Sequence, residues 1–330
     1  MRWPILVLPL IALGCGDDDR VHHLADAPIP PAARGLYVTQ EGGSIAVFAL
    51  DATGDAAPIR SISGPATGLN LPIGIDVEPV TGFLYVANRR AGTVTVYTPE
   101  AIGDVAPVKT LTATGMGSPE GVAFTTAGDL YVSTCPGCGG GNGGQTGVFR
   151  FSAGSTTSDA TLGGAANANT GFTNPGSIAI DPDTGELVIG NSFMGNISTF
   201  SAGVSGDVAP ARAFSPGSLN LQSIAVAAGT VFVAAPGSGS VLKMFPTSAT
   251  GTPAPTMIQN GGALSVTYPG GVFVDGGGSS PVLYIVDYMG NAVHIVHTTG
   301  VAPDLSVATV DTIRGAATTL SGPLWVRLVR

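Results

Sequence analysis

The sequence predicts an all-β protein: a six-bladed β-propeller with four antiparallel strands per blade, its ring closed by pairing the two ends of the chain. An apolar segment with the pattern Leu-Tyr-Val, or a close variant of it, occurs six times at intervals of about 50 residues, which is the period of a propeller blade. Turn residues separate these segments from a second set of apolar runs. Only 11% of the 330 residues are charged, which is too few for the surfaces of long helices.

The recurring segment is the second strand of each predicted blade. It is rich in β-branched and aromatic residues and is bounded by turn residues, which is typical of a strand. Its six copies span residues 35–40, 83–88, 129–134, 186–191, 230–235 and 282–287. A further apolar run follows each copy and predicts the third strand, over residues 44–50, 93–98, 147–152, 196–201, 240–245 and 291–297.

The innermost strand of each blade precedes this segment and usually opens with Pro. These strands open at residues 72, 119, 175, 221 and 269. Turns join them to the second strands, and Asp-Pro-Asp-Thr-Gly at 181–185 is the clearest example. Its acidic residues also suit calcium, but Asp-Pro-x-x-Gly is ordinary turn chemistry, so we favour a turn.

The outermost strand follows a Gly-Asp-x-Ala-Pro turn in three of the repeats. A basic residue stands two positions after the Pro of each turn: Arg60, Lys109 and Arg212. The Pro lacks a backbone N–H, which costs nothing at an exposed sheet edge. The charged side chain that follows it discourages pairing with another chain. These features predict an edge strand on the outside of the ring.

The two ends of the chain predict how the ring closes. Residues 35–65 supply three strands of a blade without an innermost strand, whereas residues 322–329 supply an innermost strand with nothing after it. Joined, the two segments complete a sixth blade and leave no open edge in the ring. The predicted propeller domain is therefore residues 34–330.

The first residues predict export from the cytoplasm. Met1-Arg2 precedes a short apolar run that ends in Ala-Leu-Gly before Cys15, which is typical of a secretory signal. A Cys directly after the small residue resembles a bacterial lipoprotein signal, although a single basic residue and Ala12 depart from the usual pattern. The resemblance implies a signal peptide over 1–14, a lipid on Cys15, a tether over 15–33 and a place in the bacterial cell envelope. The alternative is an ordinary signal peptide with an incidental Cys.

Composition excludes several classes of partner and structure. The net charge is −9 with only 13 Lys and Arg, which argues against a nucleic-acid binder because such proteins neutralise phosphates. A hydrophobic content of 44% excludes charge-driven disorder. We expect a monomer whose contact with the membrane is made through the lipid.

The strand pattern resembles NHL-type and YVTN-type repeat propellers. The resemblance rests on the Tyr-Val-Ala-Asn run at 85–88 with a Pro-x-Gly-Ile strand before it, and it covers residues 35–328. It implies the architecture but no activity, since propellers of this general shape include gluconolactonase-like hydrolases, streptogramin-lyase-like enzymes and binding modules.

A functional site is expected where the innermost strands begin and the second strands end, because antiparallel pairing brings both to one mouth of the central channel. Two carboxylates and two asparagine amides stand among these positions: Glu120 and Asp287, and Asn88 and Asn191. By type and face, this set resembles the calcium shell of gluconolactonase-like propellers, and hard oxygen ligands suit Ca²⁺. Apart from this possible Ca²⁺ we predict no cofactor. The alternative is that Asn and Asp at strand ends are caps and turn residues.

Two functions follow from these alternatives. The favoured hypothesis is a non-catalytic module that binds a protein, a glycan or a small ligand at its mouth. The other is a metal-dependent, lactonase-like hydrolase or lyase that uses Glu120, Asn191 and Asp287. Against catalysis, His294 and His297 stand on a third strand away from the mouth, which leaves no histidine there as acid or base.

Cys135 and Cys138 lie in a Gly-rich loop after the second strand of the third repeat. A redox pair is favoured by a helix N-terminus, which is not predicted here. A zinc site needs two further ligands at suitable spacing. A local disulfide needs only the oxidising exterior that a secretory signal implies, and this is the pairing we favour.

Overall fold

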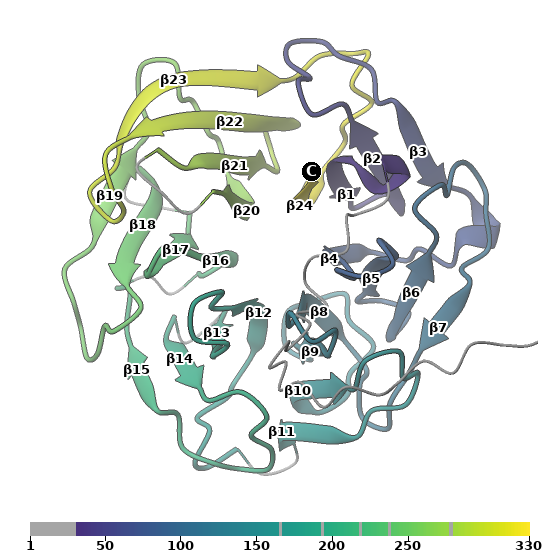
Figure 1. The fold of residues 1–330 in the computed structure, drawn as a ribbon, viewed down its shortest axis with the longest axis vertical. Helices are drawn as coiled ribbons and strands as arrows, with labels where there is room; N and C mark the ends of the chain where they lie inside the picture. The colour runs from purple at the N-terminus through teal and green to yellow at the C-terminus, as the bar shows by residue number, and fades with distance from the viewer. Residues whose placement is uncertain (1–30, 165–166, 193–194, 218–219, 237–238, 277–279) are drawn as a thin grey trace, which may run out of the picture.

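The computed structural model describes residues 31–330 except 165–166, 193–194, 218–219, 237–238 and 277–279. Six four-stranded sheets surround a central axis, which confirms the predicted six-bladed propeller (Figure 1). The predicted signal peptide, Cys15 and the tether up to residue 30 lie outside the described residues. Within the described part, no helix is long and apolar enough to span a membrane.

The strands follow the same order in each blade, from the axis outward. Blades 1 to 3 contain β24 (Pro323–Val329), β1 (Gly35–Gln40), β2 (Ser44–Phe48) and β3 (Arg60–Ser63); β4 (Pro72–Val77), β5 (Leu84–Asn88), β6 (Thr93–Tyr97) and β7 (Lys109–Leu111); β8 (Pro119–Phe124), β9 (Leu130–Thr134), β10 (Thr146–Phe151) and β11 (Ala160–Gly164). Blades 4 to 6 contain β12 (Pro175–Ile180), β13 (Leu187–Asn191), β14 (Ile197–Phe200) and β15 (Arg212–Phe214); β16 (Ser223–Ala227), β17 (Thr230–Ala234), β18 (Ser240–Pro246) and β19 (Thr256–Gln259); β20 (Pro269–Asp275), β21 (Val282–Asp287), β22 (Ala292–Thr299) and β23 (Ser306–Ile313).

The hydrophobic core lies between neighbouring blades. Every residue of β5 and of β13 is buried, because each sheet has a blade packed on both of its faces. Tyr85 and Val96 of blade 2, for example, belong to one apolar cluster with Val122 and Val132 of blade 3. Burial on both faces explains why the second strands are almost continuously apolar instead of alternating with polar residues.

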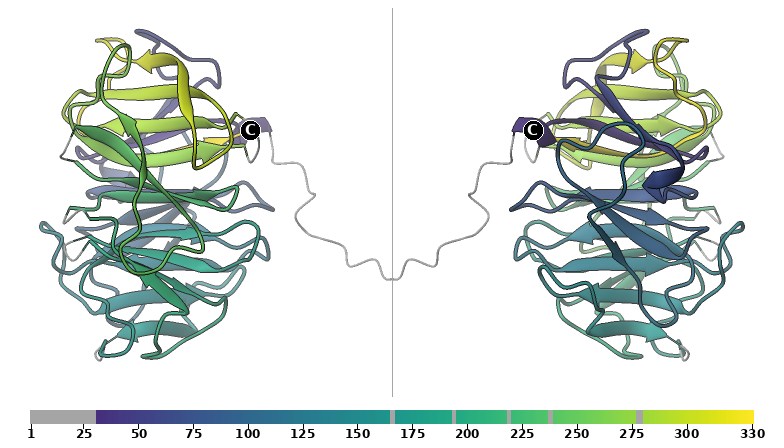
Figure 2. Two further views of the ribbon diagram at one scale, coloured as in Figure 1. Left: turned by 90° about the vertical axis from the view of Figure 1, so that its left-hand side faces the viewer. Right: turned by 90° about the vertical axis from the view of Figure 1, so that its right-hand side faces the viewer.

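The ring closes as the two chain ends predict. β24 pairs antiparallel with β1, and Leu36 and Val38 lie opposite Leu328 and Val326. The 3-10 helix Pro31–Ala33 and the C-terminal end lie at the same face of the disc, as the edge-on views of Figure 2 show. Closure removes the free sheet edges that a ring with a gap would expose.

The outer edges are covered in a way that the sequence did not predict. The Gly-Asp turn of blade 2 lies against the outermost strand of blade 1, where Gly103 donates a backbone hydrogen bond to Ser61 and accepts one from Ser63. The carboxylate of Asp104 accepts a hydrogen bond from the amide of Ala66 at 2.7 Å. Equivalent turns at Asp55 and Asp207 bind the amides of Ala317 and Thr170.

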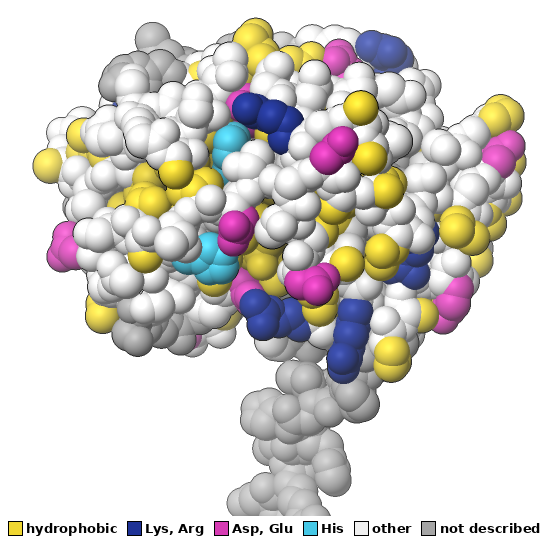
Figure 3. Space-filling view, turned by 90° about the horizontal axis from the view of Figure 1, so that it is seen from above, with side chains coloured by type: hydrophobic (Ala, Val, Ile, Leu, Met, Phe, Trp, Pro, Cys, Tyr) yellow, Lys and Arg dark blue, Asp and Glu magenta, His cyan; other side chains and the backbone are white. Residues whose placement is uncertain are grey.

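Two of the basic residues of the outermost strands also have partners within the ring. Arg60 donates to the carbonyl oxygen of Pro99 and to the hydroxyl of Tyr37, and Arg212 forms an ion pair with Glu186. They therefore tie strands together instead of serving only as exposed edge charges. Over the rim of the disc, charged side chains of both signs are scattered among uncharged ones (Figure 3).

Candidate functional site

The innermost strands begin and the second strands end around a cavity of about 480 Å³, at the end of the channel that we call the mouth. The second residues of four innermost strands line this mouth cavity, together with the residue directly before β16: Ile73, Glu120, Gly270 and Leu324, and Gln222. Antiparallel pairing places them there because each innermost strand runs away from the mouth while its partner runs toward it.

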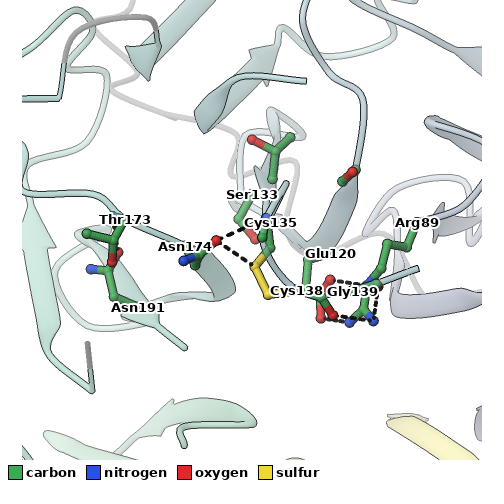
Figure 4. The surroundings of a disulfide bond; sticks show 12 residues. Arg89, Glu120, Ser133, Cys135, Cys138, Gly139, Thr173, Asn174 and Asn191 are labelled. Atoms are coloured by element: carbon green, nitrogen blue, oxygen red, sulfur yellow. Dashed lines mark hydrogen bonds and ion pairs between the residues drawn. A yellow bond between two sulfur atoms is a disulfide. The ribbon is translucent and has the colours of Figure 1, made fainter. Parts of the chain in front are cut away.

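A buried ion pair forms one wall of the mouth cavity. Glu120 is only 6% exposed, and both of its carboxylate oxygens accept hydrogen bonds from Arg89, one of them from Nε at 2.5 Å. Figure 4 shows this two-point contact between side chains of neighbouring blades. Burial raises the pKa of Glu120, and the Arg89 guanidinium opposes this shift only in part.

The loop after β9 covers this pair. Cys135 and Cys138 are joined by a disulfide with a Cα–Cα distance of 5.3 Å, and the amide of Gly137 donates to Asn174. Gly139 and Gly140 follow with φ values of 74° and 63°, in the left-handed region that favours glycine. Both line the mouth cavity, so the cross-linked loop forms part of its wall.

Two tyrosines form an aromatic wall. The rings of Tyr268 and Tyr288 pack edge to face with centroids 6.1 Å apart. The hydroxyl of Tyr288 donates to Glu41 at 2.5 Å, and the hydroxyl of Tyr268 accepts from Asn220 at 3.1 Å. The hydrogen bond to Glu41 raises the pKa of Tyr288. Both rings are thus oriented by hydrogen bonds before any ligand arrives.

The four predicted calcium ligands do not form one shell. Asn88, Asn191 and Asp287 are each 0% exposed. Their side-chain oxygens accept hydrogen bonds from backbone amides of the loop that leads into the innermost strand of their own blade, at Asn70, Thr173 and Thr267 respectively. Figure 4 shows Asn191 beside Thr173 and apart from the Arg89–Glu120 pair.

These three side chains therefore have the contacts of loop caps, which is the alternative given above. Glu120 alone of the four lines the mouth cavity. Among the residues that the structure describes, no three His, Cys, Asp or Glu side chains are grouped to hold a metal ion. The calcium hypothesis stays a prediction to which this geometry lends no support.

Asp287 is the most heavily bonded of the caps. Its carboxylate accepts hydrogen bonds from the amides of Thr267, Tyr268 and Gly290, so it also fixes the start of the aromatic wall. Burial alone raises its pKa, but His294, whose Nε2 lies 3.7 Å from Oδ2, and the hydrogen bonds from these amides outweigh burial and lower the pKa to about 2. His294 is buried behind it on β22.

Sequence reasoning missed the residues that follow the second strands by one position. Glu41, Arg89 and Tyr288 come directly after Gln40, Asn88 and Asp287, and all three line the mouth cavity. Successive side chains of an extended chain point in opposite directions. The last residue of each of these strands turns back into its own blade as a cap, so the residue after it faces the mouth. This alternation is the sequence signal that could have identified the three residues.

The rest of the channel forms a second cavity of about 850 Å³. It is lined largely by apolar residues of the innermost strands, together with an ion pair in which Arg327 Nε lies 2.9 Å from Asp76 Oδ1. Trp325 lines both cavities. At the far end of the channel, Asp181 accepts a hydrogen bond from the amide of Asp183, and this contact is that of an ordinary turn.

Comparisons with known proteins show the fold alone. No family model matches the chain, and no curated protein matches it. A solved structure of a nidogen/laminin complex has 15% identity and a TM-score of 0.58 and covers 88% of this chain and 97% of its own. A functionally unknown protein from Desulfotomaculum acetoxidans DSM 771 has 17% identity and a TM-score of 0.55 and covers 84% and 79% of the two chains.

Proposed function

We propose that this chain is a lipid-anchored binding module of the bacterial cell envelope that holds a small ligand in its mouth cavity. The observation that carries the proposal is the pre-ordered cavity of about 480 Å³. Its volume lies within the range of small-molecule sites, which combine apolar and aromatic walls with a few placed polar groups. Arg89, Tyr268 and Tyr288 are already held by hydrogen bonds, which lowers the entropy that binding must overcome.

The direction of the first strand supports the anchored arrangement. β1 ends at the mouth, where Gln40 pairs with Pro323, and it begins at the opposite face, where Gly35 pairs with Val329. A tether attached before Gly35 would therefore join the disc at the face away from the mouth. An anchor on Cys15 would leave the mouth directed away from the membrane and open to ligand.

Ligand binding is tested with the full chain and the low-molecular-weight fraction of a bacterial cell extract. A ligand that binds only the folded state raises the melting temperature. Met289→Trp places a large ring at the mouth from a position that is 61% exposed, and it should abolish this rise. Met257→Trp, at a 43% exposed position on the outer strand β19, is the matched control and should retain it. The proposal fails if the extract has no effect or stabilises all three proteins equally.

The anchor is tested separately by changing Cys15 to Ser. The unchanged chain should incorporate labelled fatty acid and sediment with membranes, whereas the variant should do neither. Equal amounts of both proteins in the membrane fraction would refute the lipid on Cys15.

A further inference from the structure

We propose that the ligand of the mouth cavity carries a carboxylate, bound by Arg90 and Arg89, and a ring-shaped body that packs against Tyr268 and Tyr288. The inference rests on the proposed function, because it names the chemistry that the mouth cavity would recognise. It follows from which charged groups of the cavity already have partners and which do not.

Both carboxylates of the mouth cavity are engaged. Glu120 accepts two hydrogen bonds from Arg89, and Glu41 accepts the hydroxyl proton of Tyr288 in a hydrogen bond at 2.5 Å. Glu120 is therefore neutralised within the protein, whereas Glu41 keeps its charge and has a hydrogen-bond partner. A cation placed between them would compete with the partners that they already have.

The guanidinium groups, in contrast, retain unused donors. Arg90 is exposed and lines the mouth cavity, and its side chain has no ion pair or hydrogen bond within the described part of the chain. Arg89 holds Glu120 through Nε and Nη2, while its Nη1 has only two long contacts, at 3.5 Å, to the carbonyl oxygens of Cys138 and Gly139. Contacts of that length are at the limit of a hydrogen bond, so Nη1 remains available to a stronger acceptor.

The glycine loop keeps a side chain away from the guanidinium of Arg90. A Cβ atom at Gly140 would lie 3.5 Å from Nη2 of Arg90, and the φ of 63° disfavours any residue that has one. A planar guanidinium fork matches the two oxygens of a carboxylate. Arg89 is already balanced by Glu120, whereas Arg90 has no acidic partner among the described residues and the charge of Glu41 lies at the aromatic wall beside Tyr288. One cation without a partner favours a singly charged carboxylate over a doubly charged phosphate.

The remainder of the mouth cavity fits an uncharged ring. Tyr268 and Tyr288 present two rings at an interplanar angle of 64°, and Leu71, Leu324 and Trp325 add further apolar surface. Rings packed edge to face with aromatic side chains gain energy beyond that of area burial. A ligand with its carboxylate at the arginines and its ring at the tyrosines would use both walls at once.

The test is isothermal titration of the full chain with two matched pairs of probes and with inorganic phosphate. Phenylacetate is compared with phenylacetamide, and glucuronate with glucose, so the better pair shows whether the preferred ring is aromatic or a sugar. We expect at least one acid to bind about tenfold more tightly than its neutral counterpart, as one charged hydrogen-bonded pair provides. The inference is overturned if no acid binds, if neutral and acid forms bind alike, or if phosphate binds most tightly.

Variants locate the effect. Arg90→Gln should lower the affinity for the acid about tenfold and leave that for its neutral counterpart unchanged. Lys109→Gln removes the same charge from the outermost strand of the same blade and should change neither affinity. Equal behaviour of the two variants would overturn the assignment to Arg90. If the extract stabilises the protein while acids show no preference, the proposed function stands and the carboxylate inference fails.

Discussion

Deleting residues 322–330 should unfold the entire ring and not one blade alone. The deletion removes β24, which is the innermost strand of blade 1 and pairs with the inner edge of β1. Because each blade packs on two neighbours, the loss exposes the apolar faces of blades 2 and 6 as well.

The size of the effect can be estimated from the buried side chains of β24. Trp325, Val326, Leu328 and Val329 are 8%, 1%, 5% and 3% exposed. At about 2 kcal/mol for each buried apolar side chain, the deletion removes about 8 kcal/mol, before the lost backbone hydrogen bonds are counted. A whole domain is stable by only about 5–15 kcal/mol, so little or no stability remains.

The assay is thermal unfolding followed by circular dichroism and by calorimetry. Deletion of Arg330 alone is the control, since that side chain is 67% exposed and forms a surface ion pair with Asp275. Leu328→Ala should give an intermediate loss of about 2–4 kcal/mol. A protein lacking 322–330 that melts cooperatively at the unchanged temperature would refute the closure argument.

Three further predictions concern the mouth. Asp287→Asn should lower the free energy of unfolding by about 2 kcal/mol at pH 7. The folded pKa of about 2, against an ordinary value of 3.8, adds stability above pH 4 that is lost as the pH falls toward 2. Urea unfolding should therefore show the difference in stability between the two proteins shrinking below pH 4, and a difference that stays constant would contradict this reasoning. Glu120→Gln should increase the affinity for a carboxylate probe by roughly threefold to tenfold, since Arg89 is then no longer paired with an anion; titration that finds weaker binding would contradict the assigned role. Chelation of calcium should leave the melting temperature unchanged, because backbone amides already donate hydrogen bonds to the side-chain oxygens of Asn88, Asn191 and Asp287. A melting temperature that falls on chelation and recovers when calcium is added would restore the calcium hypothesis.

The outer edges and the mouth show where prediction from the sequence stopped. The Gly-Asp turns were recognised as turns, but their contacts with the preceding blade were not predicted. The pairing of Arg89 with Glu120 joins residues 31 positions apart, and the hydrogen bond from Tyr288 to Glu41 joins residues 247 positions apart. No local pattern marks such partners, because the first pair meets only when blades 2 and 3 pack together and the second only when the ring closes.

The strands, their number in each blade and the closure of the ring could all be predicted from the sequence. These features follow from local properties: β-branched and aromatic runs, turn residues between them, and a repeat that begins and ends partway through a blade. Which side chains face the mouth, in contrast, depends on contacts between segments that are distant in the sequence. At the end of a strand the direction of a side chain depends on the loop amides it can reach, and so Asn88 turns into its own blade to bind Asn70 while the next residue, Arg89, reaches across to the neighbouring blade.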